Sequence, residues 1–120
     1  MEDLPPPRNP VPERLARVVD ARVPTFAQVG PPWRSDVFVT AAEDVEELSA
    51  EALPERLGIR PAPAFYVAVF RASSLEGRGA SPVRRSDEGF VGRGRTRGGA
   101  RESVVPNQPI PPTATIREVH

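Results

Sequence analysis

The sequence predicts a small α+β or α/β domain, ordered as short helix, strand, acidic helix pair and strand, followed by a largely disordered C-terminal half rich in Arg, Gly and Pro. Residues 64–71 are β-branched or aromatic at nearly every position, which is typical of a buried strand. Apolar residues in 12–22 and 40–58 follow helical spacing, and after Arg71 the apolar period disappears. With 38% hydrophobic residues in 120, the chain has apolar area for one small core.

The first element expected is a helix from Pro12 to about Arg22. A proline suits the first turn because its missing N–H would have no helical partner there, and Leu15 and Val18 then fall on one face. The preceding residues, 1–10, include three consecutive prolines and are expected to form a flexible, extended arm.

A short strand at 37–40 is expected to lead into the acidic helices. Thr40 and Glu43 have the spacing of a capping box, which marks the start of a helix. Pro54 should divide this helix in two, because it removes a hydrogen-bond donor and displaces the residue before it. If the strands at 37–40 and 64–71 pair directly, the chain between them is long enough for a right-handed parallel crossover with the helices on one face.

These patterns divide the chain into four parts. They are a Pro-rich flexible arm at 1–10, a small folded core at 11–71, an Arg/Gly/Ser-rich disordered segment or long loop at 72–108, and an extended tail or edge strand at 109–120. A sheet of two or three strands is marginal alone, so the apolar strand within the core is expected to complete its burial against another protein or a second copy.

The charge is balanced overall but divided along the chain. The formal net charge is zero, yet residues 36–58 hold seven acids and one arginine, a net charge of −6, whereas residues 72–103 hold seven arginines and four acids, a net charge of +3. All 16 basic residues are arginines, which favours a GC-rich genome as the source. The same composition would result if a GC-rich stretch were read in an unselected frame, although the consistent helix and strand patterns before Arg71 argue against that.

The sequence offers few groups for catalysis. There is no cysteine, and the single histidine is the final residue, His120. The glycine-rich run at 92–99 lacks both the dinucleotide-binding spacing and the lysine of a P-loop. We therefore expect no catalytic, cofactor or metal site. Whether the protein is an enzyme stays open, and a non-catalytic role is favoured. No window has the roughly 20 apolar residues of a membrane span and no signal peptide is visible, so a cytoplasmic location without membrane contact is the default expectation.

The function most favoured by the sequence is that of a non-catalytic accessory or assembly protein. It would dock on a protein partner, or on a second copy, through a small core and extended arms, and the residues expected to contact that partner are Trp33, Arg34, Phe65, Val67 and Val69. One alternative is nucleic-acid binding by the Arg-Gly segment at 78–101, through Arg93, Arg95, Arg97 and Arg101. A further alternative is a subunit or remnant of a larger enzyme.

Overall fold

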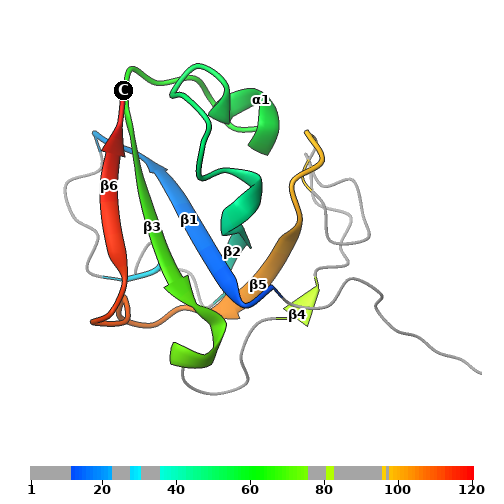
Figure 1. Ribbon diagram of the computed structural model, residues 1–120, viewed down its shortest axis with the longest axis vertical. Helices are drawn as coiled ribbons and strands as arrows, with labels where there is room; N and C mark the ends of the chain where they lie inside the picture. The colour runs from blue at the N-terminus through cyan, green and yellow to red at the C-terminus, as the bar shows by residue number, and fades with distance from the viewer. Residues whose placement is uncertain (1–11, 23–27, 31–35, 76–80, 83–95, 97) are drawn as a thin grey trace, which may run out of the picture.

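The computed structural model describes residues 12–22, 28–30, 36–75, 81–82, 96 and 98–120. Within these ranges the chain forms one antiparallel sheet with the strand order β4-β5-β2-β1-β3-β6 (Figure 1). Its strands are β1 (Arg14–Asp20), β2 (Asp36–Ala41), β3 (Phe65–Arg71), β4 (Ser81–Pro82), β5 (Glu102–Pro106) and β6 (Thr115–Val119). Helical structure here is limited to the 3-10 turns η1 (Ala42–Asp44) and η2 (Ala72–Ser74) and the short helix α1 (Leu53–Leu57).

The expected first helix is wrong, because 14–20 form strand β1. This strand pairs with β3 along its whole length, from Arg14 opposite Arg71 to Asp20 opposite Phe65. Both of its faces are buried, with Leu15 in one hydrophobic cluster and the next residue in the other. A strand buried on both faces loses the alternation that identifies strands, so the helical spacing of its apolar residues was coincidental.

The acidic helix pair is also wrong. Thr40 does not cap a helix: it lies in β2 opposite Glu102, and its hydroxyl donates to the Ala16 carbonyl at 3.4 Å. Only the single turn η1 follows, and no side chain caps it. The second half of the expected pair does contain helix α1, whose end is closed by Gly58 at φ 71° with its N–H bonded to the Pro54 carbonyl at 2.8 Å.

The expected direct pairing of the strands at 37–40 and 64–71 is wrong, because β1 lies between β2 and β3 and pairs antiparallel with both. The expectation of a largely disordered C-terminal half is wrong where this half is described: β5 pairs with β2, and β6 pairs with β3 at the sheet edge. Each of these strands has only five residues. Their burial comes from partners far away in the sequence, which a local pattern does not reveal. The arm expected at 1–10 lies outside the described residues. The rest of the segment expected to be disordered or a long loop, at 76–80, 83–95 and 97, also lies outside the described residues.

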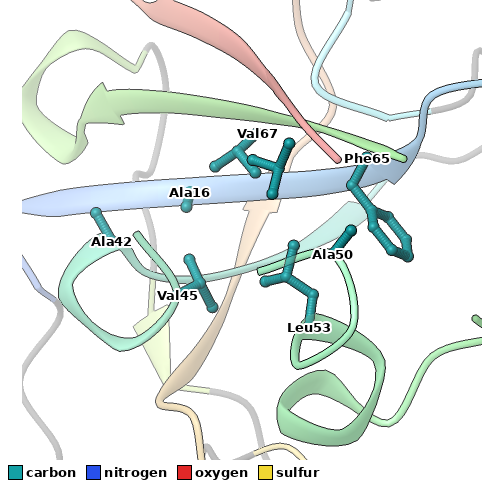
Figure 2. Close-up of a cluster of buried hydrophobic side chains, with 8 residues drawn as sticks. Ala16, Ala42, Val45, Ala50, Leu53, Phe65 and Val67 are labelled. Carbon is teal, nitrogen blue, oxygen red and sulfur yellow. The ribbon is translucent and has the colours of Figure 1, made fainter. Parts of the chain in front are cut away.

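Both faces of the sheet carry a hydrophobic cluster. On one face, the segment that follows β2 covers β1 and β3, and Figure 2 shows Val45, Ala50 and Leu53 facing Phe65 and Val67. The cluster on the opposite face contains Leu15, Val29, Val37, Val39, Phe70 and Val105. The strands therefore find their burial within this chain, where the sequence alone favoured a partner.

Candidate functional site

A small pocket with charged and apolar lining residues lies where β1 and β2 separate. The two strands pair only at Leu15 with Ala41 and at Ala16 with Thr40. Beyond these two pairs, the Arg17 guanidinium donates from Nη1 to the Phe38 carbonyl at 3.0 Å. This side-chain hydrogen bond replaces the backbone hydrogen bonds that would otherwise join β1 to β2. The resulting pocket has a volume of about 140 Å³. Its polar lining residues are Arg17, Thr40, Thr96 and Glu102.

Glu102 is the titratable group that sets the chemistry of this pocket. The residue begins β5 and is half-buried. Burial raises the pKa of Glu102 above its ordinary value, and the nearby charge of Arg17 offsets only part of this effect. A carboxyl group of this kind gives up and regains its proton closer to neutral pH, as general acid–base catalysis requires.

Thr96 forms the pocket wall on the side of α1. Its hydroxyl donates to the Arg56 carbonyl at 2.6 Å and accepts from the Ala100 N–H at 3.0 Å. In return the Arg56 guanidinium donates from Nη1 to the Gly98 carbonyl at 3.0 Å. The two bonds to Arg56 attach the segment before β5 to the C-terminal end of α1, and the bond from Ala100 closes a turn within that segment.

Asp44 also holds the segment before β5. Its carboxylate accepts from the Arg101 N–H at 2.8 Å, from Nε at 2.9 Å and from Nη2 at 3.0 Å. Burial alone would raise the pKa of Asp44, but the hydrogen bonds and charge of Arg101 outweigh it and hold the pKa below its ordinary value. Because Arg101 immediately precedes Glu102, this ion pair fixes the start of β5 and with it the position of the pocket carboxylate.

Replacing Asp44 with asparagine should destabilise the protein by about 1 to 3 kcal/mol at neutral pH, since a charge-assisted set of bonds becomes neutral. A carboxyl group with a lowered pKa in the folded state stabilises fully above its unfolded pKa of about 3.9, and this stabilisation is lost as the pH falls through the folded value. The difference in unfolding free energy between wild type and Asp44→Asn, measured in urea, should therefore close below about pH 4. A gap that persists unchanged at pH 3 would contradict this role of the charge.

Gly98 lies against the end of α1 without space for a side chain. A Cβ at this position would be 2.2 Å from the Glu55 carbonyl oxygen and 2.4 Å from that of Arg56. Because backbone atoms cannot turn aside, we expect Gly98→Ala to cost about 3 kcal/mol, the upper end of overpacking effects. Gly99→Ala is the matched control: its φ of 93° is strained for alanine, yet the nearest atom is the flexible end of Arg56 at 3.4 Å, so about 1 kcal/mol is expected. Equal costs in urea unfolding would contradict the close approach.

The residues expected from the sequence to bind partners are distributed differently. Phe65 and Val67 are buried in the core at 1% and 0% exposure, and Val69 packs partly buried against the same cluster. Arg101, expected to contact nucleic acid, forms an ion pair with Asp44. The remaining candidates, Trp33, Arg34, Arg93, Arg95 and Arg97, lie outside the described residues.

A second hollow of about 800 Å³ lies beside α1, near the C-terminal end of β6. Its floor is apolar, formed by alanine, proline and isoleucine side chains that include Ile59. The acids at this groove, Glu51 and Glu55, are exposed to solvent. Exposed carboxylates around an apolar floor fit acid–base chemistry less well than the half-buried Glu102 does.

Sequence reasoning missed both charged residues of the pocket. Arg17 was assigned to a helix, and Glu102 was counted only as an acid that dilutes the Arg-Gly charge. The available signal was a lone acid directly before Ser103 and the two β-branched residues Val104 and Val105. The proximity of Glu102 to Arg17, however, arises because β1 and β5 both pair with β2, although the two residues are 85 positions apart in sequence, and no local pattern reports it.

The described residues thus define a small antiparallel β domain with a charged pocket on one face of its sheet. The chain matches the family model of Novel toxin 10 (Ntox10) over residues 7–120, and it belongs to this toxin family. A search of curated proteins and a search of solved structures each found no match. Across the described ranges, no helix has the length and apolar character needed to cross a membrane. The function is accordingly of toxin type, exerted through contact with a partner or target molecule.

Proposed function

We propose that this toxin domain is an enzyme that cleaves nucleic-acid phosphodiester bonds, with Glu102 as general acid–base and Arg17 as the phosphate-binding group. The observation that carries the proposal is the half-buried Glu102 carboxylate, with its raised pKa, in one pocket with the Arg17 guanidinium. A toxin that acts catalytically needs few molecules to disable a cell, which is consistent with so small a domain.

The two side chains have complementary tasks in such a reaction. The Glu102 carboxylate takes the proton of an attacking hydroxyl or water as its oxygen bonds to phosphorus. The bond from phosphorus to the leaving oxygen then breaks, and that oxygen receives the proton back from Glu102. Arg17 binds the phosphate oxygens and stabilises the charge that they carry in the transition state. Its bond to the Phe38 carbonyl holds the guanidinium in place before substrate arrives.

The distribution of arginine supports a polyanionic substrate. Residues 72–103 carry a net charge of +3, and two of their arginines, Arg95 and Arg97, are the sequence neighbours of the pocket residue Thr96. Arginine pairs with phosphate through two parallel N–H bonds and stacks on bases. The nucleic-acid binding favoured by the Arg-Gly segment and the chemistry of the pocket then belong to one function.

The proposal is tested with the Glu102→Gln variant in two assays. One follows bacterial growth after induced expression, and the other follows degradation of purified total RNA, single-stranded DNA and double-stranded DNA. The matched control is Glu47→Gln, an exposed acid outside the pocket. Growth arrest and cleavage that depend on Glu102 and persist in Glu47→Gln would support the proposal. Growth arrest by the Glu102→Gln protein equal to that of the wild type would overturn it.

A docking role on a protein partner remains a second proposal. The sequence favoured an accessory or assembly protein that docks through its core and arms, and the core residues Phe65 and Val67 are now buried within the chain itself. A specific observation still supports contact with a partner: edge strand β6 exposes Ile116, at 48%, to solvent. The same toxin domain can therefore carry both a catalytic pocket and a separate interaction surface.

A further inference from the structure

We propose that β6 pairs with β6 of a second copy of this chain, antiparallel and centred on Ile116, to form a symmetric dimer with one continuous sheet. β6 ends the sheet, and no strand of the described residues pairs with its outer edge (Figure 1). Four of its five residues are exposed, and Ile116 and Ile59 are the large hydrophobic residues exposed on the described surface. An unpaired edge with an exposed apolar side chain is a template for another strand.

The symmetry of a dimer restricts the register. A two-fold axis that joins two antiparallel edge strands stands perpendicular to the sheet, so each face of one copy continues into the same face of the other. Residues directly opposite each other point to the same face. The pairing of β3 with β6 places Ile116 and Glu118 on one face, opposite Ala68 and Tyr66, and Arg117 on the other, opposite Val67. The two-fold axis must therefore lie level with one residue of β6, so that this residue faces its own copy. It cannot lie level with the midpoint between two consecutive residues.

The charges of β6 then select one register. An axis at Arg117 would place that arginine directly opposite its own copy, and an axis at Glu118 would do the same with two carboxylates, each of which is destabilising. With the axis at Thr115 or Val119, the two copies of β6 would face each other at one residue only. An axis at Ile116 pairs the exposed isoleucine with itself and Thr115 with Arg117 of the second copy, and it opposes no like charges.

The resulting contact is short, since residues 115–117 of each strand face each other. Contacts that bury less than about 1,200 Å² in total belong to weak, transient complexes. The dimer is accordingly expected to form as concentration rises, and to be minor in dilute solution. Such a concentration-dependent contact also leaves the Arg17–Glu102 pocket untouched, because the pocket lies beyond β1, which is separated from β6 by β3.

The first experiment is sedimentation velocity of the full chain from about 10 µM to about 1 mM. The wild type should show a weight-average sedimentation coefficient that rises with concentration. Ile116→Arg should abolish the rise, since it removes the apolar contact and places two positive charges on the axis. Ile59→Arg is the matched control because it alters the other exposed large hydrophobic residue, which is not part of β6. A wild type that stays monomeric, or a control that fails equally, would overturn the proposal.

The second experiment tests the register by cross-linking. The chain has no cysteine, so Ile116→Cys, Arg117→Cys and Glu118→Cys each introduce one unambiguous thiol. Only side chains that face each other across the axis reach disulfide distance. Under mild oxidation the Ile116→Cys protein should give at least about 10-fold more dimer than the other two. Faster cross-linking at 117 or 118 would contradict the Ile116 register. Because all variants keep Glu102, their nuclease assays separate a failure of the dimer from a failure of the proposed activity.

Discussion

Exchange of Glu102 for glutamine is expected to abolish toxicity while making the protein more stable at neutral pH. Loss of a general acid–base typically lowers a rate by about 100-fold to 10,000-fold, and the amide that replaces the carboxylate has no titratable proton to exchange. Most inactivating substitutions also destabilise, so a variant that loses activity and gains stability is a distinctive result.

The gain in stability follows from the raised pKa of Glu102. Burial disfavours the ionised form, so the folded protein holds its proton more tightly than the unfolded chain does, whose glutamate titrates near about 4.3. Between those two pKa values the folded state binds more protons, and the free energy of unfolding falls as pH rises. Glutamine carries no charge and avoids this loss. The Glu102→Gln variant should therefore match the wild type near pH 3 and exceed it at pH 7 and above.

Urea unfolding at several pH values measures this difference, with Glu47→Gln as the control. Glu47 is exposed and lies outside the pocket, so its exchange should change neither the stability nor the activity appreciably. A Glu102→Gln variant less stable than the wild type at pH 7 would mean that the ionised carboxylate has a stabilising partner. The pocket would then be a structural ion pair, and the case for acid–base chemistry would end.

The sequence predicted individual strands better than it predicted their arrangement. The strands expected at 37–40 and 64–71 coincide with β2 and β3, because both carry runs of β-branched or aromatic residues. β1 was mistaken for a helix, since it is buried on both faces and flanked by a proline suited to a first turn. β5 and β6 were missed or left open because short strands next to prolines and charges carry little local signal.

The candidate site was beyond local reasoning for a related reason. Arg17 and Glu102 share a pocket only because β2 stands between β1 and β5 in the sheet. The succession of strand, helices and strand suggested a crossover in which the strands at 37–40 and 64–71 pair directly. In the structure, β1 lies between these two strands and pairs antiparallel with both. Thr40 shows the same effect. Its spacing from Glu43 predicted the start of a helix, but pairing with Glu102 on a neighbouring strand determines its structure.

Replacement of Phe65 with alanine should cost about 3 to 5 kcal/mol of stability, the largest loss expected from a single truncation among the described residues. The ring is 1% exposed, and it is the largest fully buried side chain among the described residues. It packs in the cluster with Leu53 and Val67 shown in Figure 2. Its removal leaves a cavity that the paired strands cannot collapse to fill. Small domains have about 5 to 15 kcal/mol in total, so the variant retains little margin.

The same substitution decides between two roles for Phe65. A residue whose main contact is a partner protein would lose binding on truncation and leave the isolated chain stable, whereas a core residue destabilises the chain itself. Ile59→Ala is the matched control, because Ile59 is 38% exposed and its truncation should cost under about 1 kcal/mol. If Phe65→Ala fails to fold, Phe65→Leu supplies the graded measurement, with an expected cost on the order of 1 to 2 kcal/mol in urea. Equal stability of Phe65→Ala and Ile59→Ala would contradict the core position and return Phe65 to the partner surface.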